Sequence, residues 1–339
     1  MKIGILGSGM IVSLALKAFF YCKEEIEVVA VWHQENEKDK ARELFKDYNN
    51  VSFYTDYDSF LNNNDIEIVY VGIINSAHYE YAKKALLANK SVICEKPFTG
   101  SYWQAKELSD LARQKQLMLI EAVSFLFTPN YRLLKEEVNK LTGIKLITSV
   151  YTQYSSRYNK YLNKEVLPAF SLELCGGSLY DINIYNLNLI LGLFGRPKKV
   201  KYLANKGFNG IDTSGVAVLE YEDKQAICVG GKDCKSLNRT TIMAANGYVE
   251  LNSAPNVFTD FLVNIDSNQR TICENEYDSH MVYEFKEFYK LYKNKDLKKI
   301  YEYLDHSLLV MEVAENLRKN AGIEFPCDEN KIKEEYNAI

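Results

Sequence analysis

Residues 1–20 read MKIGILGSGMIVSLALKAFF, and this stretch decides the fold. It permits two interpretations: an apolar signal or membrane segment, or a strand that turns at Gly7-Ser8-Gly9 into a helix. Glycines at 4, 7 and 9 would loosen a signal helix, and no small-residue cleavage site follows it. Charged residues from Lys17 to Glu24 cut a membrane span short of the roughly 20 apolar residues it needs. The strand-turn-helix interpretation remains.

Composition limits the class of protein. A chain of 339 residues with 47% hydrophobic and 25% charged residues can bury a full core, and its length suggests two domains. The net charge of -4 and the scattered basic residues argue against a nucleic-acid partner. Seven widely spaced cysteines, without a C-x-x-C pair, suggest reduced thiols in the cytoplasm and no metal site.

The turn itself predicts a nucleotide site. Glycines at 7 and 9 would let the backbone approach a pyrophosphate, and Ser8, Met10 and Ile11 would lie beside it. The amides at the start of the following helix would bind the negative charge. The third position of the G-x-G-x-x-G pattern is Val12, which is larger than the usual Gly or Ala. Taken alone, the pattern therefore also fits an ordinary tight turn.

The next hundred residues favour the nucleotide site because strands and helices alternate. Strands are expected at 27–32, 51–54, 68–73, 91–94 and 117–122, and helices at 38–47, 76–88 and 101–115. Such alternation builds a parallel sheet whose ligands bind at the carboxyl ends of the strands. Gly7, Asn75 and Glu95-Lys96-Pro97 all fall at those ends.

Beyond about residue 124 the pattern changes to consecutive strands. These are expected at 144–155, 198–205, 214–221, 225–231, 239–245 and 248–251, with helices at 176–194, 278–293 and 297–320. We therefore predict an α/β Rossmann dinucleotide-binding domain over residues 1–123. An α+β domain with an open, mainly antiparallel sheet should follow over residues 124–339, for substrate binding and dimerisation, and its C-terminal helix could pack back on the first domain.

The chain resembles the glucose-fructose oxidoreductase/inositol dehydrogenase/MocA-like (Gfo/Idh/MocA) oxidoreductases over nearly its whole length. The resemblance rests on GILGSGMI at 4–11, GIINSAHYEYAKKAL at 72–86, CEKPFTG at 94–100, GGSLYDINIYNLNLILGLFG at 176–195 and HSLLVMEVAENLRKNAGI at 306–323. Within the family it looks most like the dimeric dihydrodiol dehydrogenases and related sugar dehydrogenases. These place Tyr where inositol dehydrogenases place His.

The resemblance implies an NAD(P)-dependent dehydrogenase or reductase that acts on CH–OH groups, with Lys96 in a catalytic position. Hydride transfer from an alcohol requires a group that takes the hydroxyl proton. Tyr185 is a poor base near neutral pH unless a cation stabilises its phenolate, and Lys96 would supply that cation. Asp181 could bind substrate hydroxyls or orient Lys96. On a regular helix Asp181, Tyr185 and Asn188 share one face, which could equally be a solvated surface.

Other residues match the family unevenly. The resemblance implies that Asn75 and Glu95 contact the cofactor. His78 also matches a cofactor-binding position, although its place at the start of an apolar helix favours a structural role. Asn183 stands where the family usually has Gly, so its side chain could narrow the contact with the neighbouring domain. Leu126 stands where Arg is common, which leaves one polar contact near the cofactor in doubt.

The residues that would select cofactor and substrate are less distinctive. After the second strand the sequence reads His33-Gln34-Glu35. An acidic residue there would bind the ribose of NAD, and donors such as His33 and Gln34 suit the 2′-phosphate of NADP, so the sequence leans slightly toward NADP. Arg157, within YTQYSSRYNKYL at 151–162, could bind a sugar, polyol or dihydrodiol, although a surface loop explains this stretch as well.

Two further expectations concern function and assembly. Some proteins of this fold bind the dinucleotide and act as regulators without turnover, so a non-catalytic sensor is the alternative to an enzyme. An open sheet with one uncovered face would expose apolar area, and its simplest burial is against a second copy of the chain. We therefore expect a homodimer or a higher homo-oligomer, with a small molecule as substrate and neither nucleic acid nor membrane as partner.

Overall fold

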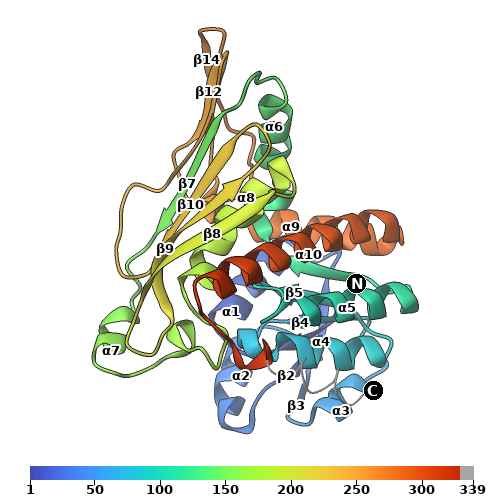
Figure 1. Ribbon diagram of the computed structural model, residues 1–339. Helices are drawn as coiled ribbons and strands as arrows, with labels where there is room; N and C mark the ends of the chain where they lie inside the picture. The colour runs from blue at the N-terminus through green and yellow to red at the C-terminus, as the bar shows by residue number, and fades with distance from the viewer. Residues whose placement is uncertain (329–339) are drawn as a thin grey trace. The chain divides into compact units, whose positions relative to one another are not determined.

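The computed structural model describes residues 1–328, and its internal contacts divide the chain into two compact units (Figure 1). The first unit contains residues 1–122 and 279–307, and the second contains residues 123–278 and the segment that begins at Leu308. The sequence predicts one domain after residue 123, with a C-terminal helix that could pack back on the first domain; in the structure residues 279–307 pack with the first unit. The division therefore falls inside the long helix α10 (Leu297–Asn320).

The described part of the first unit is built on a six-stranded parallel sheet, in the order β3-β2-β1-β4-β5-β6. The strands are β1 (Lys2–Leu6), β2 (Glu27–Trp32), β3 (Ser52–Tyr54), β4 (Ile68–Val71), β5 (Ser91–Glu95) and β6 (Leu119–Ala122). The order reverses between β1 and β4, and such a reversal opens a ligand crevice at the carboxyl ends of the strands. The predicted Rossmann fold is confirmed.

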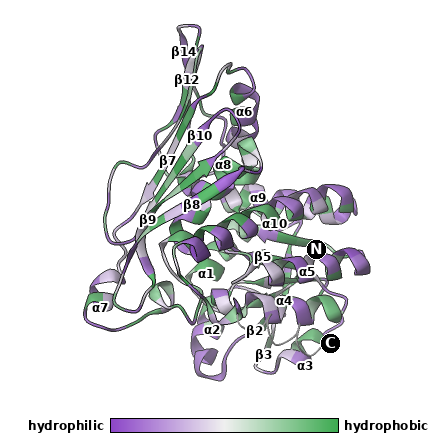
Figure 2. Cartoon of the chain, in the orientation of Figure 1, coloured by the Kyte–Doolittle hydropathy of each residue, from purple (hydrophilic) through white to green (hydrophobic). Residues whose placement is uncertain are grey.

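Helices pack on this sheet because their apolar faces match its buried strands. They are α1 (Met10–Phe19), α2 (Lys38–Leu44), α3 (Tyr57–Leu61), α4 (His78–Leu87), α5 (Tyr102–Lys115) and α9 (His280–Lys293). Helices α4 and α5 lie side by side (Figure 1). Helix α9 lies against α1, where the rings of Phe19 and Phe285 are 4.6 Å apart. Figure 2 shows α1 as mainly hydrophobic and α5 as mainly hydrophilic.

The second unit contains a larger sheet, eight-stranded within residues 1–328, in the order β14-β13-β12-β11-β7-β10-β9-β8. Its strands are β7 (Leu146–Thr152), β8 (Lys199–Lys206), β9 (Asp212–Glu220), β10 (Gln225–Gly231), β11 (Arg239–Ala244), β12 (Gly247–Leu251), β13 (Phe261–Ile265) and β14 (Asn268–Ile272). All neighbours pair antiparallel except β7 and β10, which are parallel. The mainly antiparallel sheet is confirmed.

Helices of the second unit position the residues of the predicted site. They are α6 (Pro129–Val138), α7 (Tyr158–Leu162), the π-helix η6 (Leu179–Asn183) and α8 (Ile184–Phe194), which continues directly from η6. The predicted single α-helix at 176–194 is therefore a π-helical turn followed by an α-helix. Contacts of η6 and α8 with β10 hold this helix on one face of the sheet.

The seam between that helix and the sheet is polar. Asn183 Nδ2 donates to the carbonyl oxygen of Cys228 at 3.1 Å, and Asn186 Nδ2 donates to that of Val229 at 3.0 Å. Both asparagines are fully buried. The side chain of Asn183 thus bonds to the sheet of its own unit, and its expected effect on a contact with the neighbouring domain stays a prediction.

No helix in the described part of the chain is long and apolar enough to cross a membrane.

Candidate active site

The glycine turn after β1 has the form that an anionic ligand requires. Gly7 has φ +98°, and a Cβ on it would lie 2.8 Å from the carbonyl oxygen of Gly72. Gly9 precedes α1 without a side-chain cap, and a Cβ there would meet nothing within 4 Å. Ser8 is buried, and its Oγ has no hydrogen-bond partner among the described residues. The uncapped amides of α1 and the open space at Gly9 fit a pyrophosphate.

Gly72 explains why Val12 can occupy the third position of the glycine pattern. Val12 is fully buried on α1, and a Cβ on Gly72 would lie only 2.9 Å from its Cγ2. The close approach of helix to sheet that the third glycine usually allows is provided here by a glycine directly after β4. The valine therefore does not argue against the nucleotide site.

The residues after β2 divide between the interior and the surface. The ring of His33 is buried, its Nδ1 lies 2.9 Å from the carbonyl oxygen of Gln34, and its amide donates to the carbonyl oxygen of Tyr54. Gln34 and Glu35 are exposed. Of the two donors expected for a 2′-phosphate, Gln34 is thus the accessible one, while the His33 ring packs inside the unit.

His78 joins two loops at the carboxyl edge of the sheet. Its Nδ1 lies 2.9 Å from the carbonyl oxygen of Pro97, after β5, and its Nε2 lies 3.2 Å from that of Ile73, after β4. The ring is fully buried, and this burial lowers the pKa of His78. Such a ring stabilises the loops and is not presented to a ligand. Asn75, in the turn between these strands, is half-buried.

Lys96 follows the last residue of β5 and is half-buried at the same edge. The preceding Glu95 turns its side chain into the unit, where the Tyr70 hydroxyl donates to its Oε1 at 2.6 Å. The amide of Lys96 donates to the other oxygen, Oε2, at 3.3 Å. Glu95 is only 6% exposed, and its carboxylate supports the backbone at Lys96. Its role as a cofactor contact stays a prediction.

Three buried carboxyl groups lie together beneath Lys96. Glu95 is joined by Glu121 of β6 and Glu284 of α9, and all three are nearly or fully buried. Burial raises the pKa of Glu121 to about 7, and the charge of Glu95 adds to this effect. Burial also raises the pKa of Glu284 well above its ordinary range, with the charges of Glu95 and Glu121 adding to it. Sequence analysis missed this cluster, although a Glu within the apolar LIEA strand signals a buried acid.

In the second unit Asp181 and Tyr185 retain partial exposure while the residues around them on η6 and α8 are buried. The Tyr185 ring packs against Tyr151 at 6.0 Å and against a small apolar cluster that contains Ile182. These two side chains are therefore available together on one side of the helix. Asn188 does not join them: it is fully buried, and its Nδ2 donates to the carbonyl oxygen of Ile184.

Lys232 is a partner of Asp181 that sequence analysis did not find. Its Nζ lies 2.7 Å from Asp181 Oδ2, although only 2% of its side chain is exposed. It follows Gly230-Gly231 at the end of β10, 51 residues after Asp181 in the chain. No short-range pattern links the two positions, so only the pairing of helix and sheet brings them together.

Arg157 lies in the loop between β7 and α7 of the second unit. It is exposed and directly precedes α7, and its amide donates to Ser155 Oγ at 3.2 Å. Arg157 thus lies in a surface loop, which the sequence allowed as the alternative to a substrate-binding segment. Arg157 as a substrate contact remains a proposal.

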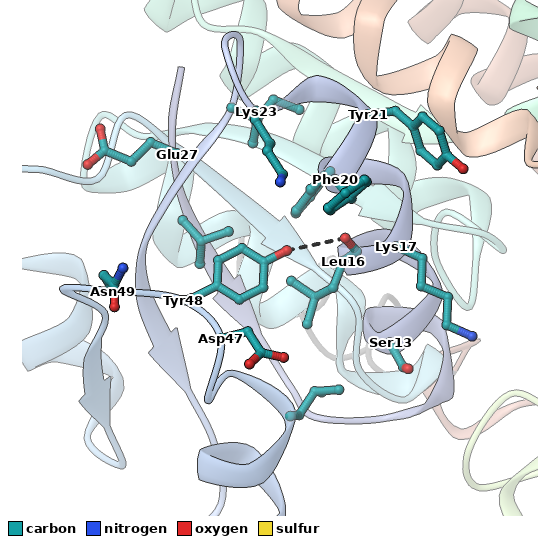
Figure 3. Close-up of a pocket in the computed structure, with 14 residues that line it drawn as sticks. Ser13, Leu16, Lys17, Phe20, Tyr21, Lys23, Glu27, Asp47, Tyr48 and Asn49 are labelled. Atoms are coloured by element: carbon teal, nitrogen blue, oxygen red, sulfur yellow. Dashed lines mark hydrogen bonds between the residues drawn. The ribbon is translucent and has the colours of Figure 1, made fainter.

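A separate cavity of about 970 Å³ lies in the first unit, where α1 ends and β2 begins (Figure 3). Phe20, Tyr21 and Lys23 line one side, and the Tyr48 hydroxyl donates to the carbonyl oxygen of Leu16 across it. Because β2 starts here, the cavity opens at the amino-terminal edge of the sheet, opposite the edge that carries Gly7 and Lys96. It therefore plays no part in the predicted site.

Residues 1–123 match the model of an oxidoreductase family with an NAD-binding Rossmann fold. In this part the chain is similar to the Gfo/Idh/MocA oxidoreductases, the family that the sequence already resembles. The match agrees with the NAD(P)-binding oxidoreductase that the sequence predicts.

Relatives match nearly the whole chain. It is 29% identical over 306 residues to scyllo-inositol 2-dehydrogenase (NADP(+)) IolU of Bacillus subtilis, covering 90% of this chain and 93% of that protein. It is 24% identical over 319 residues to human trans-1,2-dihydrobenzene-1,2-diol dehydrogenase, covering 90% and 92%. A structure of levoglucosan dehydrogenase with NADH and levoglucosan superposes with a TM-score of 0.81 at 16% identity, covering 95% and 97%, which supports the fold.

Proposed function

We propose that this chain transfers a hydride between a nicotinamide dinucleotide and a secondary alcohol or carbonyl of a polyol, sugar or dihydrodiol. The observation that carries the proposal is the edge of the first sheet, where the turn at Gly7, the loop at Asn75 and the side chain of Lys96 follow the neighbouring strands β1, β4 and β5. Full-length similarity to an inositol dehydrogenase and a dihydrodiol dehydrogenase supports this class of substrate.

When bound, the dinucleotide supplies the hydride acceptor or donor, and the protein supplies position and proton transfer. The uncapped start of α1 and Gly9 would hold the pyrophosphate, and Asn75 would lie beside the nicotinamide ribose. Gln34, exposed after β2, would donate to a 2′-phosphate, so we favour NADP over NAD. The NADP(+) specificity in the name of the Bacillus relative agrees with that choice.

Lys96 and Tyr185 would share the proton of the reacting hydroxyl. The ammonium of Lys96 favours the phenolate form of Tyr185, which accepts the proton as the C–H bond breaks and returns it in the reverse direction. Asp181, one helical turn before Tyr185, would accept hydrogen bonds from the neighbouring hydroxyls of the substrate. A polyhydroxylated substrate suits this acceptor better than a simple alcohol does.

A substrate panel tests the proposal. Purified protein would be incubated with NADP⁺ or NAD⁺ and with inositols, aldoses, levoglucosan and trans-dihydrodiols, and the nicotinamide absorbance would be followed. We expect substrate-dependent reduction with at least one polyol or sugar, faster with NADP⁺. If both dinucleotides bind but no compound is turned over, the non-catalytic sensor replaces the enzyme.

We also propose that the chain forms a homodimer through the second sheet. One face of β8, β9, β10 and β7 carries an apolar row in which Leu203 pairs with Val216, Val216 with Val229, and Val229 with Val150. Leu203 is 57% exposed, and Ile227 in the adjacent row is 38% exposed. The opposite face is buried, so this uncovered face is the area that a second copy would bury.

A further inference from the structure

The Lys232 ammonium occupies an environment that a lysine rarely enters. Its side chain is 2% exposed, and Nζ donates to the carbonyl oxygen of Ala169 at 2.5 Å and lies 4.4 Å from the centre of the Phe170 ring. A buried charge costs several kcal/mol unless it is paired and hydrogen-bonded. Asp181 Oδ2 at 2.7 Å supplies the pairing charge.

The backbone around Lys232 is fixed on both sides. Its amide donates to the carbonyl oxygen of Thr213 on β9, and its carbonyl accepts from the amide of Ser155 after β7, each at 2.8 Å. The ammonium is thus attached to the sheet and not to a loose loop. A side chain held in this way can define the position of its partner.

The helix that carries Asp181 is equally fixed on the sheet. A Cβ on Gly230 would lie 2.6 Å from the Cβ of Asn183, so this glycine permits the close approach of η6 to β10. At the start of η6 the buried Asp212 accepts from the amide of Leu179 at 2.6 Å and from the Tyr202 hydroxyl at 2.7 Å. The π-helical turn places Asp181 over the end of β10, and such turns are frequent at functional sites.

Asp181 and Lys232 differ in accessibility, so that only one side chain of the pair faces solvent. The Asp181 side chain is 34% exposed and that of Lys232 is 2% exposed. A ligand can therefore reach the carboxylate but not the ammonium behind it. Asp212 also interacts with the charge of Lys232. Burial raises the pKa of Asp212, while the hydrogen bond from Tyr202 and the Lys232 charge oppose that rise.

We propose that Lys232 is a positioning residue for substrate specificity, which holds the Asp181 carboxylate ionised and in one orientation to accept hydrogen bonds from a polyhydroxylated substrate. This role rests on the proposed function, because it assigns Asp181 to substrate hydroxyls. The lysine acts through Asp181 and does not touch the reacting atoms.

The test compares Lys232→Met, which removes the charge at similar volume, with Asp181→Asn and with the double variant. Steady-state kinetics would use scyllo-inositol or the best substrate of the panel, and calorimetry would measure substrate binding to the protein with NADP⁺ bound. Losing a hydrogen bond to a charged group corresponds to about 10- to 100-fold. We expect each single variant to raise KM and Kd for the substrate by that factor, with a smaller change in kcat and no change in NADPH affinity.

The coupling and a second variant separate positioning from folding. Lys232→Met should have little further effect in the Asp181→Asn background, since the lysine would then have no carboxylate to hold. Lys232→Arg should retain most of the binding, and Lys232→Gln, which keeps a donor for Ala169, should replace Lys232→Met if that variant does not fold. Wild-type KM in the charge-removing variant, or equal losses with and without Asp181, would overturn the role of Lys232.

Failure of the proposed function has a different signature. In that case the wild-type protein would neither turn over nor bind any polyol or sugar, and the assignment of Lys232 would fall with it. Wild-type turnover combined with an unaffected Lys232→Met variant would overturn the positioning role alone.

Discussion

Glu121→Gln should change the pH dependence of stability of the first unit. Glu121 is 3% exposed on β6, beside the buried carboxyl groups of Glu95 and Glu284. Burial raises the pKa of Glu121 from its ordinary value of 4.5 to about 7, because the ionised form loses its hydration. The folded protein therefore keeps a proton on Glu121 at pH values where the unfolded chain has already released it.

The sign and size of the effect follow from that difference. Between pH 4.5 and 7 the folded state binds the additional proton, so the free energy of unfolding falls as pH rises. One pKa unit corresponds to about 1.4 kcal/mol, so the contribution of Glu121 is fully present below pH 4.5 and has fallen by up to about 3 kcal/mol above pH 7. Glutamine imitates the protonated acid and does not titrate, so Glu121→Gln should remove this loss.

Urea unfolding between pH 5 and 8, followed by tryptophan fluorescence, measures the effect. The chain has two tryptophans, Trp32 and Trp103, and both lie in the first unit, so the signal reports on that unit. Relative to wild type, Glu121→Gln should become more stable with rising pH by up to about 3 kcal/mol, whereas Glu24→Gln, at an exposed position, should not. A stability difference for Glu121→Gln that is equal at pH 5 and pH 8 would refute the reasoning.

Three further outcomes are expected. Gly72→Ala should lower the free energy of unfolding of the first unit by about 1–3 kcal/mol, because the new methyl group overpacks against Val12. Adding Val12→Ala should restore part of that loss, and chemical denaturation that shows the two single losses simply adding in the double variant would contradict the contact. In sedimentation experiments Ile227→Glu should convert the dimer into monomer, whereas Leu237→Glu, at a position that is 81% exposed and outside the strands, should not. A wild-type protein that sediments as a monomer at micromolar concentration would exclude this dimer. Fluorescence titration should show tighter binding of NADPH than of NADH, and Gln34→Ala should reduce that preference; tighter binding of NADH would contradict the choice of NADP.

The first unit was predictable because local patterns determine it. Short apolar runs such as Ile68–Val71 alternate with helices, and a sheet buried on both faces leaves little choice of strand position. The position of Lys96 at the end of β5 followed from this alternation alone. The acidic cluster was not predictable in the same way, because Glu284 reaches it from a helix far along the chain.

The second unit was less predictable because its contacts are long-range. Strands β13 and β14 were missed. The polar and exposed segment Asn268–Ile272 lacks an apolar signal, whereas Phe261–Ile265 is apolar and could have been assigned as a strand. The parallel pairing of β7 with β10 joins distant segments and has no local pattern. The π-helical turn at Leu179–Asn183 was missed as well, and it changes the angle between Asp181 and the residues of α8 from that of regular α-helical spacing.

The central claim is that Lys96 and Tyr185 act as a unit in proton transfer, and a double-mutant cycle on turnover tests it most directly. Initial rates of NADP⁺ reduction would be measured with the best polyol or sugar for wild type, Lys96→Met, Tyr185→Phe and the double variant, with NADPH affinity measured in parallel. Each single variant should lose about 10²- to 10⁴-fold in kcat and retain NADPH binding. The double variant should lose little more than the worse single variant. Losses that multiply, or wild-type turnover in Tyr185→Phe, would contradict the account.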